Sequence, residues 1–462
     1  MRIKLDKPFL LEEALKAIKC KRVSSEYLNH KVTHVCTDSK ICRNGDLFIA
    51  IRGKNYDGNA YVDEAKARGC ICIADNSDHA HFTVDDSTVA LLSLAEFYKS
   101  QMTGLKACIA VTGSVGKSST KEFLKKIIGA CRNAHANFGN YNNTIGVAHT
   151  LLTMRYGCEY LICEIGMNHS GEISKLSKCI HPDIAMITNV GTAHIGNLGS
   201  REKIAEAKME ISHGMNNGAV LIPYNENLLK ATKNAMTVGY NNEPSLSDFT
   251  LCKSGTSSYR FIYPGGEIND LYIAINQEHQ MMNISMALAA STLSGLSDEE
   301  IKKGVKMINS DDLRQRFIEM AGFTIFDDSY NASLESITAD LKYLFKGFVG
   351  RPIGAFIGDI AELGDSAENI HTQLGKLAAE LHLSSLYLIG NYSEYVARGA
   401  TESGFDDSRI FINNDLNNPE YSIEQINKNH LSEEIILFKG SHSSQIYKIA
   451  DAMAKTERNR ND

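Results

Sequence analysis

Short apolar runs recur along the chain and alternate with helical patterns. The runs stand at residues 46–51, 70–74, 107–111, 160–164, 184–188 and 219–222. Uninterrupted runs of this kind are typical of strands that are buried on both faces of a parallel sheet. Apolar residues at helical spacing lie between several of them, at 61–67, 91–104 and 120–129. The alternation predicts an α/β fold with parallel sheets.

The alternation restarts near residue 314, with strands predicted at 323–327, 353–358, 386–390 and 435–439. Residues 244–276 are richer in β-forming residues and turn glycines, which predicts a small antiparallel addition. A chain of 462 residues has the length of about three domains. We therefore expect an N-terminal domain at 1–82, a central domain at 83–313 and a C-terminal domain at 314–462. The polar tail at 456–462 is expected to fray.

The composition narrows the class of protein. Hydrophobic residues make up 43% of the chain and charged residues 22%, with a net charge of −7 at pH 7. This excludes disorder as the dominant state, and the mildly acidic balance argues against general nucleic-acid binding, which needs a concentrated basic face. The sequence has neither a run of the roughly 18 apolar residues that a membrane helix needs nor the apolar core of a signal peptide. We expect a cytoplasmic protein without membrane or nucleic-acid partners.

The 11 cysteines lie between Cys20 and Cys252 and form no CxxC pair. Cys70 and Cys72 are too close together for a zinc knuckle. We expect reduced and mostly buried thiols rather than a disulfide framework or a metal cluster.

A glycine-containing loop, Thr112-Gly-Ser-Val-Gly-Lys-Ser-Ser119, separates the strand at 107–111 from the helix at 120–129. Glycines let the backbone wrap an oxygen-rich ligand, and amide groups at a helix N-terminus favour anions. Lys117 would reach the β- and γ-phosphates of a nucleotide, and the Ser118 hydroxyl would ligate Mg²⁺. The spacing is shorter than a full Walker A string, because position 111 is Val, so a plain strand–helix turn is the alternative. The flanking strand and helix favour nucleotide binding.

Two polar residues follow strand ends near this loop. Glu164 closes a buried strand, and His194 ends the string Asn189-Val-Gly-Thr-Ala-His194 after the next strand. Mg²⁺ is often held by a carboxylate at the carboxyl end of a parallel strand. The alternatives are a solvated carboxylate for Glu164 and a structural or surface histidine for His194. Lys208 lies in a helical segment, where periodicity alone predicts a solvated lysine.

Taken together, strings along nearly the whole chain resemble the Mur ligase family, and they occur in the family's order. They are Asp38-Ser39 with Gly45-Asp-Leu-Phe-Ile-Ala50 and Asp57-Gly58; Thr112-Gly-Ser-Val-Gly-Lys117; Asn140-Tyr-Asn-Asn143 with Ile145-Gly146; Glu164-Ile-Gly-Met-Asn-His169; Asn189-Val-Gly-Thr-Ala-His194; Ala207-Lys208 with Glu210; Asp327-Asp-Ser-Tyr-Asn-Ala332; Gly358-Asp359 with Glu362-Leu-Gly364 and His371; and Lys439-Gly-Ser441.

The resemblance implies an N-terminal UDP-recognition domain, a central ATP-binding domain and a C-terminal Rossmann-like domain that closes over ATP. It is strongest to the ligases that add D-alanyl-D-alanine to UDP-N-acetylmuramoyl-tripeptide through an acyl phosphate, in peptidoglycan precursor synthesis. It therefore implies a monomeric, ATP-dependent amide-bond ligase acting on small molecules. Cell-wall formation, cell shape and cell division are the implied processes.

The resemblance also assigns roles to residues in the ATP site. Lys117, Glu164, His194 and Lys208 would be catalytic. Two Mg²⁺ ions would be held by Ser118, Glu164, His194 and Lys208, the last as a carbamate formed with CO₂, which supplies the oxygen ligands that Mg²⁺ prefers. The implied nucleotide contacts are Gly113, Ser114, Val115, Gly116, Lys117, Ser118 and Ser119 for the phosphates, Arg314 or Arg316 for a phosphate, Asp328 near the ribose, and Asn283, Tyr330 and Asn331 near adenine. The implied contacts to the UDP-linked substrate are Asp38, Ser39, Lys40, Asn142 and Asn143.

Several positions depart from the family pattern. The departures are Lys40 for Arg, Thr144 for Glu, Gln280 for Asn, Ser333-Leu334 for Asn-Pro, His442 for Arg, and Leu313 or Gln315 for the Gly before the interdomain Arg. None removes the phosphate loop, the Mg²⁺ candidates or Lys208. Three alternatives stay open: a divergent ligase that joins another carboxylate and amine, a non-catalytic nucleotide-binding subunit, and a kinase. The third residue of the peptide substrate, meso-diaminopimelate or lysine, also stays open.

Overall fold

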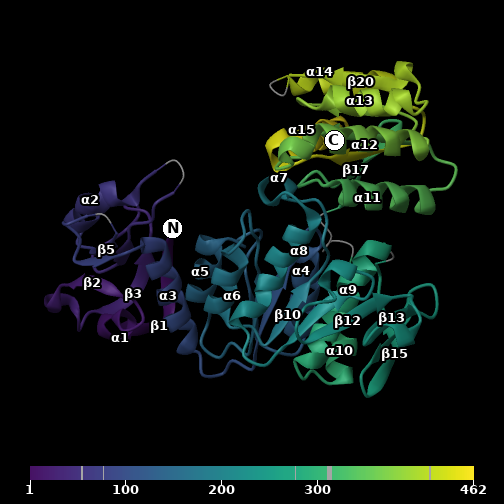
Figure 1. Cartoon of the computed structure of the whole chain (residues 1–462). Helices are drawn as coiled ribbons and strands as arrows, with labels where there is room; N and C mark the ends of the chain where they lie inside the picture. Colours follow the sequence, from purple (N-terminus) through teal and green to yellow (C-terminus); the bar gives the residue numbers. More distant parts are fainter. Residues whose placement is uncertain (54–55, 76, 276, 310–314, 416–417, 462) are drawn as a thin grey trace.

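Three β-sheets form the centres of three lobes (Figure 1). The computed structural model describes residues 1–53, 56–75, 77–275, 277–309, 315–415 and 418–461. The N-terminal lobe lies beside the central lobe, and the C-terminal lobe lies above the central lobe in this view, with α7 (Ile195–Leu198) at their junction (Figure 1). The expected α/β class is confirmed.

The N-terminal lobe contains a six-stranded sheet with the order β1-β3-β4-β5-β6-β2. Its elements are β1 (Arg2–Leu10), α1 (Leu11–Leu15), β2 (Cys20–Val23), β3 (Lys31–Cys36), β4 (Leu47–Ile49), α2 (Val62–Ala67), β5 (Ile71–Ala74) and β6 (Phe82–Val84). The inner strands are parallel, and β1 and β2 pair antiparallel at the edges. The runs at 46–51 and 70–74 and the helix at 61–67 are confirmed as β4, β5 and α2.

The central lobe contains a nine-stranded sheet with the order β15-β14-β13-β12-β11-β10-β7-β9-β8. Its strands are β7 (Ala107–Thr112), β8 (Ala134–Ala136), β9 (Tyr160–Glu164), β10 (Ile184–Ile187), β11 (Ala219–Pro223), β12 (Ala235–Tyr240), β13 (Phe249–Lys253), β14 (Ser258–Tyr263) and β15 (Gly266–Tyr272). The strands from β8 to β13 run parallel, whereas β14 and β15 pair antiparallel. The antiparallel addition predicted within 244–276 is confirmed.

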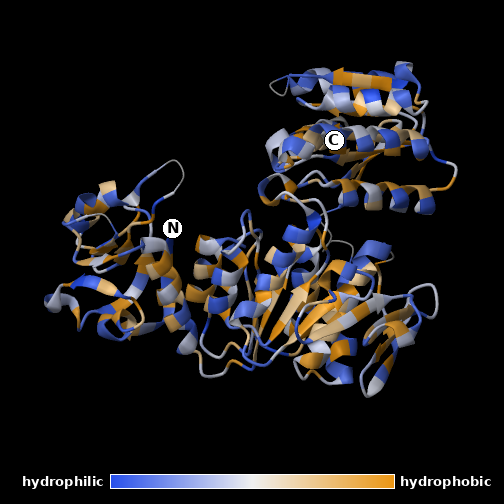
Figure 2. Cartoon of the chain, viewed as in Figure 1, coloured by the Kyte–Doolittle hydropathy of each residue, from blue (hydrophilic) through white to orange (hydrophobic). Residues whose placement is uncertain are grey.

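Helices cover both faces of the central sheet. They are α3 (Ser87–Ser100), α4 (Lys117–Gly129), α5 (Thr144–Leu152), α6 (Glu172–Ile180), α7, α8 (Arg201–Met209), α9 (Glu278–Leu293) and α10 (Asp298–Val305). One core packs α3, α5 and α6 on the sheet and continues into the N-terminal lobe, and the other packs α4, α9 and α10 on the opposite face. Figure 2 shows the apolar residues gathered along the strands between these layers.

Two predicted helices begin earlier than expected. α3 begins at Ser87 rather than residue 91, because the Asp86 carboxylate caps it by accepting hydrogen bonds from the amides of Thr88 and Val89. It ends at Ser100 rather than residue 104. α4 begins at Lys117 rather than residue 120. Gly116, the last residue of the loop, directly precedes it and has a φ of 83°. The helix N-terminus therefore lies immediately at the glycine loop.

The C-terminal lobe contains a six-stranded sheet with the order β16-β17-β21-β18-β19-β20. Its elements are β16 (Arg316–Met320), β17 (Phe323–Asp327), α11 (Leu334–Gly347), β18 (Ile353–Gly358), α12 (Ala367–Glu380), β19 (Leu386–Ile389), α13 (Ser393–Glu402), β20 (Ile410–Asn413), α14 (Pro419–Asn429), β21 (Glu434–Lys439) and α15 (Ile446–Asn461). All pairs except β16–β17 are parallel. The helix α15 continues to Asn461 and so includes most of the polar tail that is expected to fray.

The expected boundary between the first two domains, at residues 82 and 83, lies close to the end of the first sheet. The first sheet ends with β6 at Val84, and the second begins with β7 at Ala107. Among the described residues, no helix has the length and apolar character to span a bilayer. All 11 cysteines are free thiols, and only Cys20, Cys131 and Cys252 are not fully buried.

Candidate active site

The phosphate loop joins β7 to α4 and depends on its glycines. Gly113 and Gly116 have φ angles of 151° and 83°, which side chains with a Cβ rarely adopt. A Cβ on Gly116 would lie 2.5 Å from Asn283 Oδ1, so the loop also packs tightly on α9. Lys117 Nζ donates hydrogen bonds to the carbonyls of Gly113 and Ser114, at 2.6 and 3.1 Å. The lysine thus lies folded over the loop.

Asn189, at the end of β10, fixes the conformation of this loop. Its Oδ1 accepts hydrogen bonds from the amides of Ser114 and Val115, at 3.0 and 2.8 Å. Asn189 belongs to one of the strings that resemble the family, but no role is predicted for it from the sequence. The available signal was topological, since β7 and β10 are parallel neighbours whose carboxyl ends meet.

Glu164 lies beside the phosphate loop with both carboxylate oxygens engaged. Its Oε2 accepts a hydrogen bond from Ser118 Oγ, and its Oε1 accepts one from Asn142 Nδ2, both at 2.7 Å. The residue is 1% exposed, so the alternative of a solvated strand-end carboxylate is wrong. The structure thus brings together three residues that the sequence assigned to metal and substrate binding.

Lys208 is buried as well. It is 1% exposed on the face of α8 that also buries Ile204 and Ala207, so the solvated helix-face position expected from periodicity is wrong. Burial, and then the nearby charge of Lys117, lower the pKa of Lys208 well below its ordinary value. In the part of the chain that the structure describes, Lys208 forms no ion pair with a carboxylate. The buried position therefore favours the neutral amine over the ammonium form.

His194 lies where the central and C-terminal lobes meet. It precedes α7 with a φ of 66°, and its Nδ1 contacts the carboxylate of Glu362 in the C-terminal lobe. Nearby, the Glu335 carboxylate of α11 accepts hydrogen bonds from the amide and hydroxyl of Thr192, at 2.8 and 3.2 Å. The histidine thus takes part in a contact between the two lobes, and it also lines the cavity that lies between them.

A cavity of about 740 Å³ lies between the central and C-terminal lobes. We call it the phosphate-loop cavity. Its lining includes Ser114, Val115, Gly116, Lys117, Ser118, Ser119, Asn142, Asn143, Glu164, His194, Asn283, Asp328, Tyr330 and Asn331. Gly113 and Lys208 lie outside this lining. Most of the expected nucleotide contacts are therefore gathered around one space, although they come from both lobes.

Neither of the two arginine candidates for the phosphate contact is seen at the cavity among the described residues. Arg314 lies outside the described residues. Arg316 does not line the cavity, because its guanidinium pairs with Asp327 at 2.7 Å and with Asp451. These two carboxylates hold Arg316 on the C-terminal lobe, away from the phosphate loop.

A buried charged cluster, which sequence reasoning missed, forms part of the cavity wall. Lys439 Nζ pairs with Asp328 and, at 2.7 Å, with Asp340, and Gln315 Nε2 donates to Asp340 at 2.7 Å. Burial raises the pKa of Asp340, and the charge of Lys439 opposes that shift. Burial opposes the charged form of Lys439, but the two carboxylates outweigh it and raise the pKa of Lys439. Asp328 is thereby fixed at the cavity by a partner distant in sequence.

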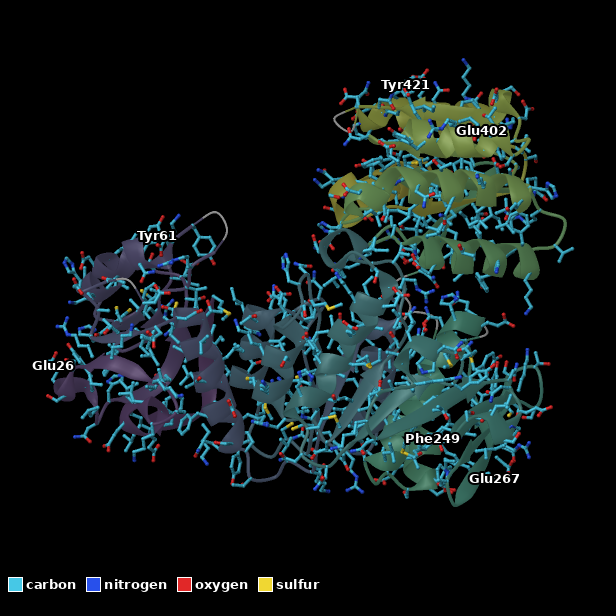
Figure 3. All side chains as sticks on the ribbon, in the orientation of Figure 1. Glu26, Tyr61, Phe249, Glu267, Glu402 and Tyr421 are labelled. Carbon is cyan, nitrogen blue, oxygen red and sulfur yellow. The ribbon has the colours of Figure 1, made fainter. Side chains whose placement is uncertain are left out.

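A second cavity, of about 650 Å³, lies between the N-terminal and central lobes. We call it the N-terminal cavity. Its lining includes the expected substrate contacts Asp38, Ser39, Lys40 and Asn143, together with Tyr61, which is labelled in Figure 3. Asn140 and Asn143 line both cavities, whereas Asn142 lines only the phosphate-loop cavity. The two cavities therefore share a wall.

Three of the sequence departures have clear local contacts. Gln280 Oε1 accepts a hydrogen bond from Asn283 Nδ2 at 3.1 Å and so orients that amide. Ser333 caps α11, because its hydroxyl accepts from the Ser336 amide at 3.2 Å. His442 stacks on Tyr447 with ring centroids 4.9 Å apart.

Comparisons with known proteins agree with this architecture. Residues 111–291 match the family described as the Mur ligase middle domain. The chain is 31% identical over 439 residues to a UDP-N-acetylmuramoyl-tripeptide–D-alanyl-D-alanine ligase from Bacillus subtilis, covering 92% of this chain and 93% of that protein. A ligase of the same name from Escherichia coli is 29% identical over 435 residues, covering 91% and 93%.

Solved structures give the same picture. Crystal structure I of MurF from Acinetobacter baumannii is similar with a TM-score of 0.85 at 28% identity, covering 98% of this chain and 100% of that chain. The MurF ligase from Thermotoga maritima, solved in complex with ADP, is similar with a TM-score of 0.74 at 25% identity, covering 92% and 98%.

Proposed function

The chain belongs to the Mur ligase family, and we propose that it joins D-alanyl-D-alanine to UDP-N-acetylmuramoyl-tripeptide at the expense of ATP. Two relatives are named for this activity, and their similarity to this chain extends over more than nine-tenths of their length. The reaction would supply the pentapeptide precursor of peptidoglycan. We also propose that the chain acts as a monomer in the cytoplasm, on small-molecule substrates.

The wall shared by the two cavities carries this proposal. A ligase of this kind must bring the carboxylate of a UDP-linked substrate to the γ-phosphate of ATP. The N-terminal cavity contains Asp38, Ser39 and Lys40, and the phosphate-loop cavity contains Lys117 and Ser118. Because Asn140 and Asn143 line both, an acceptor bound in the first can extend towards a phosphate bound in the second.

The residues present fit Mg²⁺ bound together with nucleotide phosphates. In the described parts of the chain, no group of three or more His, Cys, Asp or Glu side chains has the geometry of a complete metal cage. Mg²⁺ commonly uses one or two carboxylates plus substrate phosphates and water instead. Ser118 and Glu164, already in contact at 2.7 Å, would hold one ion, and His194 would contribute to a second. Bound Mg²⁺ would neutralise charge on the phosphates.

Lys208 has the properties needed for carbamylation. Its lowered pKa increases the fraction of the amine that is unprotonated, and this form has the nitrogen lone pair that would attack CO₂. The N–C bond forms as one nitrogen proton is released, and the product is an anionic carbamate. Its oxygens would be hard ligands beside Lys117, which already influences Lys208 electrostatically.

The proposed reaction has two steps. The acceptor carboxylate attacks the γ-phosphorus of ATP and forms an acyl phosphate with release of ADP. The amine of D-alanyl-D-alanine then attacks the acyl carbon, and the tetrahedral intermediate collapses to an amide and inorganic phosphate. Lys117 and the loop amides offset the negative charge that two anionic reactants bring together. Closure of the C-terminal lobe would exclude water, which would otherwise hydrolyse the acyl phosphate.

Phosphate release provides the test. Mg-ATP and UDP-N-acetylmuramoyl-tripeptide, containing either meso-diaminopimelate or lysine, are supplied with and without D-alanyl-D-alanine, and the products are weighed by mass spectrometry. The proposal requires phosphate release that depends on both substrates and a pentapeptide product. A stable phosphorylated acceptor would indicate a kinase instead. Turnover with other carboxylates and amines alone would indicate a divergent ligase, and binding without turnover a non-catalytic subunit.

A further inference from the structure

A buried lysine on α4 has no part in the proposed chemistry. Lys121 lies four residues after Lys117 on the phosphate-loop helix and is 1% exposed. Its Nζ donates hydrogen bonds to the carbonyls of Asn137 and Gly139, at 2.9 and 3.1 Å, and pairs with Glu122 at 2.9 Å. Lys121 lines neither cavity. Its amino group is therefore directed at a segment of backbone rather than at a ligand site.

That segment, residues 137–143, is the loop before α5, and it also surrounds Glu164. The Asn137 side chain is 2% exposed and exchanges two hydrogen bonds of 2.9 Å with the backbone of Glu164. Asn142 of the same loop donates to the Glu164 carboxylate, which also accepts from Ser118. The loop thus contacts α4 in two ways, directly through Lys121 and indirectly through Glu164 and Ser118.

The same loop supplies the wall shared by the two cavities. Asn140 and Asn143 line both of them, and Tyr141 lines the N-terminal cavity. A ligand in either cavity therefore meets the loop that Lys121 holds. Because buried polar groups without partners cost free energy, the two carbonyls and the buried amino group keep each other in place.

We propose that Lys121 is a positioning residue that couples the two cavities, so that nucleotide bound at the phosphate loop orders residues 137–143 for the UDP-linked acceptor. This inference rests on the proposed function for the identity of the acceptor. Nucleotide phosphates would fix the first turn of α4 at Lys117 and Ser118, and Lys121 lies one helical turn further on the same face. Acceptor binding then requires a smaller loss of conformational entropy, because the loop is already ordered. This gives positive cooperativity between the two ligands without a large structural change.

Calorimetry of the variant Lys121→Met measures the coupling. The dissociation constant of UDP-N-acetylmuramoyl-tripeptide is determined with and without Mg²⁺ and the non-hydrolysable analogue AMP-PNP. In the wild type we expect the analogue to tighten acceptor binding by about fivefold or more, and in Lys121→Met by less than about twofold. Binding of each ligand alone should change much less than the coupling does, which separates the effect from general loss of structure.

Lys125 offers a matched control, because it lies one turn further along α4 and is exposed. Lys125→Met removes the same charge from the same helix and should keep the wild-type coupling. Equal coupling in wild type and Lys121→Met overturns the proposal. Equal loss in Lys125→Met overturns it too, since the effect would then follow helix charge rather than the contact with the loop.

Hydrogen exchange of the wild-type chain tests the same inference without a variant and without the acceptor. Mg²⁺ and AMP-PNP are added alone, and exchange is followed at the amides of residues 137–143. We expect this loop to exchange more slowly together with the phosphate loop. Protection confined to the phosphate loop overturns the inference. Since no acceptor is present, this outcome is independent of whether the proposed substrate is correct.

Discussion

Glu164 Oε2 accepts a hydrogen bond of 2.7 Å from Ser118 Oγ, although the two residues belong to different elements, β9 and α4. β9 is the parallel neighbour of β7, which leads into the phosphate loop. The carboxylate and the hydroxyl are therefore brought together by the order of the strands. We propose that the pair provides two oxygen ligands for one magnesium ion at the edge where the phosphates would bind.

Glu164→Gln keeps the size of the side chain and removes its charge. We expect metal affinity in the presence of AMP-PNP to fall by about 10–100-fold or more, because the ion loses a negatively charged protein ligand. Electron paramagnetic resonance of Mn²⁺ measures the binding, and the Mg²⁺ dependence of turnover should shift in parallel. The exposed carboxylate Glu206 provides the control Glu206→Gln. Unchanged Mn²⁺ affinity in Glu164→Gln would remove this residue from the metal site.

Lys208 should make stability depend on pH in alkaline solution. An unfolded lysine has a pKa of about 10.4, and burial holds the folded value well below it. Between these two values the unfolded chain binds more protons than the folded chain, so stability rises with pH. At pH 7 in CO₂-free buffer, we expect Lys208→Met to melt about 2 °C or more above the wild type. The difference should shrink towards pH 10, and a difference that grows with pH would contradict the burial of a neutral amine.

Carbamylation of Lys208 should make turnover depend on CO₂. We expect wild-type activity to fall in CO₂-depleted buffer and to return on addition of bicarbonate, with a carbamate signal in ¹³C spectra after ¹³C-bicarbonate is supplied. Lys203→Met changes an exposed lysine on the same helix and should behave like the wild type. The carbamate assignment fails if bicarbonate affects neither the activity nor the spectrum.

The cluster of Lys439, Asp328 and Asp340 should matter for folding as well as for the site. Lys439 is 2% exposed, so Lys439→Met leaves two carboxylates near an apolar side chain. We expect a loss of about 3–5 kcal/mol in the free energy of unfolding, measured with urea. The double variant Lys439→Met/Asp340→Leu should recover part of this loss. The exposed Lys428 gives the control Lys428→Met, and a similar small effect in both single variants would argue against a buried ion pair.

The cysteines should react according to burial. Only Cys20, Cys131 and Cys252 are partly exposed, and burial raises the pKa values of Cys108 and Cys158 to about 11. Thiolates are the reactive form, so a thiol reagent should label at most these three partly exposed residues rapidly in the native chain and all 11 after denaturation. Rapid labelling of Cys163, which is fully buried, would contradict the packing of β9.

Most of the strands that sequence patterns predicted have an uninterrupted apolar run. β7, β9 and β10 are buried at every position, and each was found from its pattern. β2, β8, β16 and β20 were not predicted, because they lie at sheet edges, where only one side is covered and the residues are largely exposed or half-buried. An edge strand is specified by the neighbour with which it pairs, and that information is not local.

The features of the candidate site also differ in whether local sequence patterns predict them. The proximity of Glu164 to the phosphate loop follows from parallel strands whose carboxyl ends meet at one edge. The burial of Lys208 does not follow from helical periodicity, because it depends on which tertiary surface α8 meets. The pairing of Lys439 with Asp340 joins two elements, β21 and α11, whose contact no local pattern predicts.

Transfer of oxygen from the acceptor to phosphate tests the central claim most directly. UDP-N-acetylmuramoyl-tripeptide carrying ¹⁸O in both oxygens of its terminal carboxylate is incubated with the enzyme, Mg-ATP and D-alanyl-D-alanine, and the released phosphate is weighed. An acyl phosphate keeps one carboxylate oxygen bonded to phosphorus when the amine displaces it, so the account predicts one ¹⁸O in phosphate and one in the new amide. Unlabelled phosphate, with both ¹⁸O atoms retained in the acceptor, would contradict it.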